Sequence, residues 1–163
     1  MGVPKIYLET TMFNYYFDEE RDAHADTVTL FEECVAGKFE PYTSVYVTDE
    51  LEAAPEEKRE KMLNLIKKYD VKVLDVSEEI NVLADKYIAE SALPNGSLTD
   101  ARHIAAATTG NLDIIVSLNF SHIVKERTRE MTGAINKIRG YNAVKILSPM
   151  EVLDSEKTRY NLM

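Results

Sequence analysis

Short apolar runs alternate along the chain with longer stretches whose apolar residues recur at helical spacing. The runs rich in β-branched and aromatic residues predict five strands, over residues 5–8, 41–45, 71–74, 113–117 and 143–147. The fourth run is almost continuously apolar, which is typical of a strand buried on both faces.

Helical spacing predicts helices in the intervening stretches, over residues 25–35, 48–54, 56–69, 78–91 and 100–109. A last helix is expected to begin at 148–151, with Pro149 in its first turn. Residues 9–11 have the character of a turn, and an aromatic cluster follows at 13–17. We interpret this cluster as core or as a protein-binding surface rather than as a platform for stacked nucleobases.

Strands that alternate with helices through short connections predict an α/β fold with a mainly parallel central sheet. The composition shows no break that would divide the chain, so we expect one domain over residues 1–154. The remaining residues, 155–163, are polar and predict a loose C-terminal tail.

Bulk composition limits the classes of function. The single cysteine, Cys34, excludes an intrachain disulfide and a cysteine-rich zinc site. The first residues lack the pattern of a signal peptide, and no apolar stretch approaches the ~20 residues of a membrane span. We therefore expect a cytoplasmic protein without a membrane partner.

A net charge of −9 argues against nucleic-acid binding, because phosphates are also negative. The charge is, however, distributed unevenly along the chain. Residues 121–163 carry eight basic and five acidic side chains, a balance of +3, which leaves −12 for residues 1–120. Lys125, Arg127 and Arg129 form a basic strip that is suited to phosphates, although the same pattern fits solvated helix charges.

Several polar residues directly follow predicted strands or open the next helix. In parallel sheets, ligands bind beyond the carboxyl ends of the strands, so these residues are candidates for a site. They are Glu9, Asp49, Glu50, Asp100, Ser117, Asn119 and His122. Converging carboxylates repel one another unless a cation screens them, and oxygen ligands suit Mg²⁺ or Mn²⁺. Such an ion activates water for attack on a phosphodiester.

Each candidate also has a structural interpretation. A glutamate at a strand end, such as Glu9, is usually a solvated turn residue, and the acids near helix starts are compatible with favourable helix-dipole contacts alone. His103, one turn after Asp100, either faces the site or fills the helix surface. His122 either caps and packs or contributes to the site.

Four segments, 6–11, 44–51, 99–107 and 115–123, resemble the successive motifs of the PIN domain family, in the family's order. The end of the chain, 145–151, resembles the family's last strand and helix start. Together these segments cover nearly the whole chain. The combination of 99–107 with 115–123 is similar to a bacterial and archaeal branch in which Asn-Phe replaces an acidic motif.

The resemblance implies a three-layer sandwich, with a parallel sheet between helices and an acidic pocket. It also implies a metal-dependent ribonuclease that uses Mg²⁺ or Mn²⁺, with RNA as its partner. Many such proteins are toxins paired with an antitoxin, and homodimers are common. By position, the ligands would be Glu9, Glu50, Asp100 and Asn119, with Thr10, Asp49, Ser117 and His122 in support.

Two positions depart from the family pattern. Glu9 replaces an aspartate, and Asn119 lacks the negative charge of the usual fourth acid, so three carboxylates remain. The alternative function is therefore a non-catalytic PIN scaffold that binds RNA or a protein. A phosphatase that forms a phosphoaspartate is a weaker candidate, because Glu-Thr-Thr follows the first strand instead of Asp-x-Asp.

Overall fold

The computed structural model describes residues 2–161, with side chains up to residue 157. The sheet contains β1 (Lys5–Leu8), β2 (Glu40–Ser44), β3 (Lys72–Leu74), β4 (Ile114–Val116) and β5 (Lys145–Leu147). The strand order is β3-β2-β1-β4-β5, and every neighbouring pair is parallel. The predicted parallel sheet is confirmed, and each strand lies close to its predicted position.

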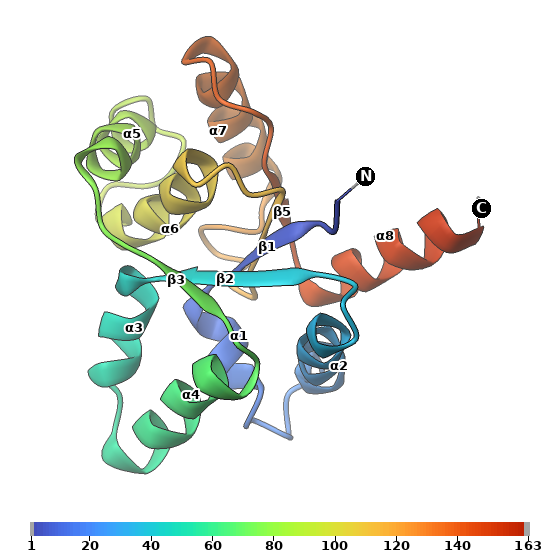
Figure 1. Ribbon diagram of the computed structural model, residues 1–163. Helices are drawn as coiled ribbons and strands as arrows, with labels where there is room; N and C mark the ends of the chain where they lie inside the picture. Colours follow the sequence, from blue (N-terminus) through green and yellow to red (C-terminus); the bar gives the residue numbers. More distant parts are fainter. Residues whose placement is uncertain (1, 162–163) are drawn as a thin grey trace.

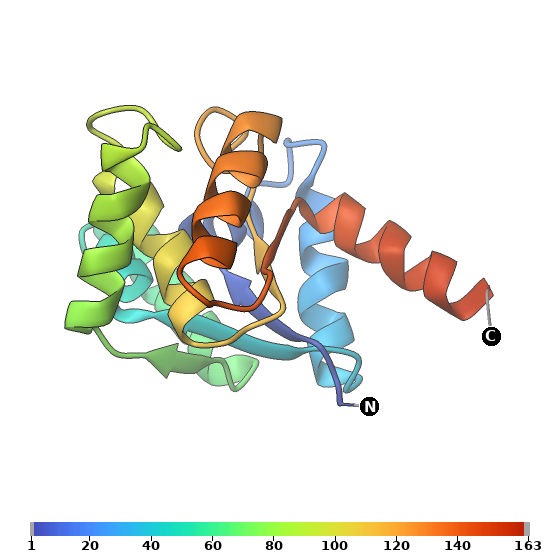
Figure 2. The same cartoon turned by 90° about the horizontal axis from the view of Figure 1, so that it is seen from above.

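Helices cover both faces of this sheet, as Figures 1 and 2 show. In Figure 1, α5, α6 and α7 lie above the sheet, whereas α1, α2 and α4 lie below it, which confirms the three-layer arrangement. The helix bounds are α1 (Thr10–Tyr15), α2 (His24–Val35), α3 (Val45–Glu52), α4 (Glu56–Lys68), α5 (Glu78–Ala89), α6 (Leu98–Thr109), α7 (Glu126–Ile138) and α8 (Pro149–Asn161).

The two central strands explain the position of the core. In β1, Ile6, Tyr7 and Leu8 are fully buried, and in β4, Ile115 and Val116 are fully buried. A strand that is buried on both faces consists mostly of apolar residues, so polar residues tend to lie at its ends. The polar residues that follow β1 and β4 therefore gather at one edge of the sheet.

Residues 9–11 do not form the predicted turn. Glu9 is the N-cap of α1, a helix that carries the first part of the aromatic cluster into the core. Phe13 is fully buried and packs edge-on against Phe31, whereas Phe17 remains 41% exposed. The interpretation of this cluster as core is confirmed for Phe13.

Helix α7 is absent from the predicted elements. Its inward face is built from Thr128, Thr132, Ile135 and Asn136, which are all buried. Met131 also packs against the core, and Met131, Ile135 and Ile138 recur at helical spacing, so the sequence carries a helix signal here that the prediction overlooked.

The predicted loose tail is wrong for the described residues beyond 154, because α8 continues to Asn161. Helix α8 packs against α2, and Val152 is buried there. Among the described residues, no helix combines the length and the apolar character needed to cross a bilayer.

Candidate metal and nucleic-acid site

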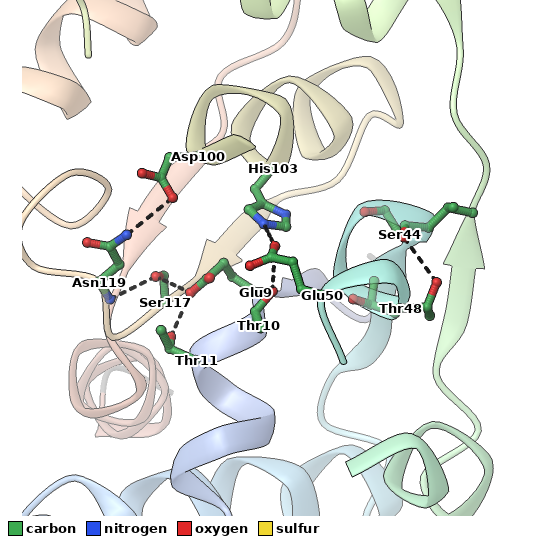
Figure 3. Close-up of polar contacts among 12 residues, drawn as sticks. Glu9, Thr10, Thr11, Ser44, Thr48, Glu50, Asp100, His103, Ser117 and Asn119 are labelled. Atoms are coloured by element: carbon green, nitrogen blue, oxygen red, sulfur yellow. Dashed lines mark hydrogen bonds and ion pairs between the residues drawn. The ribbon is translucent and has the colours of Figure 1, made fainter. Parts of the chain in front are cut away.

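Side chains from four elements meet at the carboxyl edge of the sheet. Glu9 follows β1, Glu50 lies in α3, Asp100 lies in the first turn of α6, and Asn119 follows β4. Figure 3 shows these four residues together, joined through hydrogen bonds to their neighbours. The structure thus brings together the four principal residues that the sequence predicts.

Glu9 is buried, with 3% of its surface exposed. Its Oε1 accepts hydrogen bonds from Thr11 Oγ1 and Ser117 Oγ, each at 2.6 Å. Ser117 Oγ in turn accepts the Asn119 N–H at 3.0 Å. Ser117 therefore has the predicted supporting position, whereas Thr11 was not predicted.

Glu50 is held through the same type of oxygen. Its Oε1 lies 2.9 Å from the donor Thr10 Oγ1 and 2.6 Å from His103 Nε2. Burial raises the pKa of this carboxyl, but the hydrogen bond and electrostatic attraction of His103, with the Thr10 hydrogen bond, outweigh burial and lower it below its usual value. Glu50 is thereby stabilised as a carboxylate, with the predicted Thr10 beside it.

Of the two interpretations of His103, the structure supports the one in which it faces the site, because its side chain points inward from the helix. The ring is 1% exposed, and its Nδ1 lies 2.8 Å from Tyr7 Oη. Tyr7 Oη also lies 2.6 Å from Ser44 Oγ. Burial raises the pKa of Tyr7 well above its usual value, so its hydroxyl remains protonated. Tyr7 and Ser44 were not predicted, because each belongs to a strand pattern that signals only core.

Asp100 is bound on both oxygens. Asn119 Nδ2 donates to Oδ1 at 3.3 Å, and His122 Nδ1 lies 2.9 Å from Oδ2. The Asn119 side-chain oxygen accepts the His122 N–H at 3.1 Å. His122 therefore both contacts the acidic group and shapes the turn after β4.

Asp49 lies outside this network. Its side chain is exposed and makes no hydrogen bond or ion pair among the described residues. Glu50, the next residue, is the member of this acidic pair that reaches the site.

The predicted basic strip divides into two parts. Arg129 donates to both oxygens of Glu151 and to the Ile146 carbonyl, so it ties α7 to α8 and β5. Lys125 and Arg127 are exposed and line a cavity of about 250 Å³ with residues 91–95.

The oxygen atoms at this site are of the type that binds a hard divalent cation. The two bonds received by Glu9, and the two received by Glu50, all end on Oε1, so within the described part of the chain each Oε2 accepts none. Free carboxylate oxygens are suitable ligands for Mg²⁺ or Mn²⁺. As arranged, no three His, Cys, Asp or Glu side chains among the described residues lie close enough together to hold an ion.

Comparison with known proteins adds family evidence to this geometry. A chain of VapBC-1 from nontypeable Haemophilus influenzae has 14% identity and a TM-score of 0.54, with 90% of this chain and 98% of that chain covered. A chain of VapBC2 from Rickettsia felis, a complex bound to a DNA fragment from its promoter, has 13% identity and a TM-score of 0.53, with 88% and 98% covered.

The Mycobacterium tuberculosis toxin VapC20, which cleaves the sarcin–ricin loop, has 16% identity and a TM-score of 0.53, with 68% of this chain and 86% of that chain covered. These similarities establish the fold. No curated protein matches the sequence. The PIN domain model matches residues 6–123, most of the chain, and the chain therefore belongs to the PIN domain family.

Proposed function

We propose that this protein is an endoribonuclease that depends on Mg²⁺ or Mn²⁺. The observation that carries the proposal is the hydrogen-bonded chain Glu9–Ser117–Asn119–Asp100 at the carboxyl edge of a PIN-domain sheet, with Glu50 held separately by Thr10 and His103 at the same edge. Glu9, Glu50 and Asp100 would hold the cation, and Asn119 would assist. When bound, the cation orients the scissile phosphate and lowers the pKa of an attacking water.

The protein's own residues would prepare this site before the cation binds. Ser117 and Thr11 fix one oxygen of Glu9, and Thr10 with His103 fixes one oxygen of Glu50. The remaining oxygen of each glutamate is then available as a ligand. Each glutamate is thus oriented, and the described acidic side chains would have to draw closer together when the cation arrives.

The substrate would be RNA, with phosphates next to the reacting one held by Lys125 and Arg127. Their exposure and their position along one cavity support this role. Arg129 would act structurally, because Glu151 already neutralises it.

The fold shared with VapBC chains supports a role as the toxin of a toxin–antitoxin pair, with a protein antitoxin and a homodimer as expected partners. In keeping with its composition, we propose that it acts in the cytoplasm. Size-exclusion chromatography of the purified protein tests the homodimer separately from catalysis.

The deciding experiment compares Asp100→Asn with Asp49→Asn in cleavage of single-stranded RNA with Mn²⁺. Both changes remove one carboxylate charge, but only Asp100 belongs to the network. Loss of a metal ligand removes several kcal/mol of transition-state stabilisation, so cleavage should fall by about 100-fold or more in Asp100→Asn. Asp49→Asn should cleave like wild type. Equal cleavage by Asp100→Asn and wild type would contradict the proposal.

A non-catalytic PIN scaffold is the second candidate. It is favoured by Asn119, whose amide already donates to Asp100 and which adds no charge of its own. Binding of Mn²⁺ at the acidic network without turnover of any RNA would support this candidate over the nuclease.

A further inference from the structure

His103 is an almost completely enclosed side chain beside the acidic network. It projects from α6 between β1 and α3, and only 1% of its surface is exposed. Its two ring nitrogens contact different partners, Glu50 Oε1 at 2.6 Å and Tyr7 Oη at 2.8 Å. With both nitrogens held, the ring has one satisfied orientation.

The direction of these hydrogen bonds follows from their chemistry. An ionised carboxylate only accepts, so His103 Nε2 must carry the proton that it shares with Glu50. A neutral ring accepts from the Tyr7 hydroxyl at Nδ1, and a charged ring donates to it there, so Nε2 carries a proton toward Glu50 in both forms. The Tyr7 hydroxyl also shares a hydrogen bond of 2.6 Å with Ser44 Oγ.

The chain of bonds starts and ends on the same helix. Ser44 is the N-cap of α3, yet its side chain makes no capping hydrogen bond and lies instead against Tyr7. Glu50 lies further along α3. The path Ser44–Tyr7–His103–Glu50 therefore fixes α3 at two points across β1 and α6.

We propose that His103 is a positioning residue for Glu50. Its Nε2–H holds Oε1, together with Thr10, and this leaves Oε2 available to a cation. The inference rests on the proposed function, because that function places Glu50 among the groups that hold the cation. Hydrogen-bond partners of metal-binding carboxylates typically change metal affinity by about 10–100-fold when they are removed.

Two amide variants separate positioning from simple core packing. Gln at position 103 extends an amide N–H toward the place of Nε2 and preserves the donor to Glu50. Asn is shorter, so it preserves only the contact with Tyr7 at the place of Nδ1. Both are neutral polar side chains, and a purely structural role of the ring predicts similar defects in the two variants.

The test measures Mn²⁺ affinity by isothermal titration calorimetry on the full chain, with the melting temperature of each variant as a folding control. His103→Asn should weaken Mn²⁺ binding by about 10-fold or more, and His103→Gln should stay within about 3-fold of wild type. Crystal structures of the metal-free variants should show Glu50 displaced in His103→Asn and retained in His103→Gln.

Retention of Glu50 in its wild-type position in His103→Asn would overturn the inference. Equal loss of affinity in both variants would also overturn it, because the ring would then act only by packing. If wild type itself binds no Mn²⁺, the metal-free crystal structures alone decide. Displacement of Glu50 in His103→Asn would then support positioning, while the proposed nuclease would fail.

Discussion

Two histidine–carboxylate pairs lie at the same edge of the sheet, and they differ in which partner is buried: the histidine in the pair His103–Glu50, and the carboxylate more than the histidine in the pair His122–Asp100. In the inner pair, the His103 ring is 1% exposed and contacts Glu50 at 2.6 Å. In the outer pair, the His122 side chain is 42% exposed and contacts Asp100 at 2.9 Å. Figure 3 shows the inner pair, and it shows Asp100 beside Asn119.

The difference in burial indicates a difference in role. Both nitrogens of His103 are held by partners inside the fold, so the inner pair has a single geometry. His122 Nδ1 is shared between Asp100 and, at 3.4 Å, Ser97 Oγ, and its ring reaches solvent. A buried polar network fixes a site, whereas a solvated pair loses little when it rearranges.

Replacing each histidine by alanine tests this comparison, and we expect the two variants to differ in stability more than in any other test below. His103→Ala leaves a cavity and removes a hydrogen-bond partner from buried Tyr7 and from Glu50, so the free energy of unfolding should fall by about 2–4 kcal/mol. His122→Ala should cost less than about 1 kcal/mol, because the ring is partly solvated. Urea denaturation of both variants at neutral pH measures the two values. Equal losses would show that burial does not separate the pairs.

The pH dependence of the free energy of unfolding gives a second test of the His103–Glu50 pair, and we expect a smaller effect there. The pKa of Glu50 in the folded chain lies below the usual value of 4.5, because His103 and Thr10 outweigh the effect of burial. A depressed carboxyl pKa stabilises the fold above the unfolded pKa, and this stabilisation is lost as pH falls through the folded pKa.

We therefore expect the stability difference between wild type and Glu50→Gln to shrink below about pH 4.5. Asp49→Asn is the matched control, since it removes the same charge from an exposed, uncontacted position on the same helix. Urea denaturation across the acidic range measures both differences. A constant Glu50→Gln difference as pH falls would contradict the expectation.

Most of the fold follows from local pattern. The run at 113–117 predicts a doubly buried strand, and Ile115 and Val116 are fully buried in the central region of the sheet. Parallel order follows because helices connect successive strands. The prediction overlooked α7, whose inward face mixes Thr128 and Thr132 with Met131 and Ile135.

The sequence predicts the principal residues of the candidate site but not the contacts that orient them. Glu9, Glu50, Asp100 and Asn119 follow strands or open helices, so topology places them at one edge. Their partners come from distant parts of the chain: His103 is 96 residues from Tyr7 and 53 from Glu50. A single tyrosine in a buried strand gives no local sign that its hydroxyl orients a histidine.

The most direct test of the central claim is a crystal structure of the wild-type protein soaked in Mn²⁺, with anomalous scattering to locate the ion. The account predicts Mn²⁺ bound among Glu9, Glu50 and Asp100, with Glu50 still hydrogen-bonded to His103. Mn²⁺ bound only elsewhere on the protein, or these three carboxylates without an ion at saturating Mn²⁺, would contradict it.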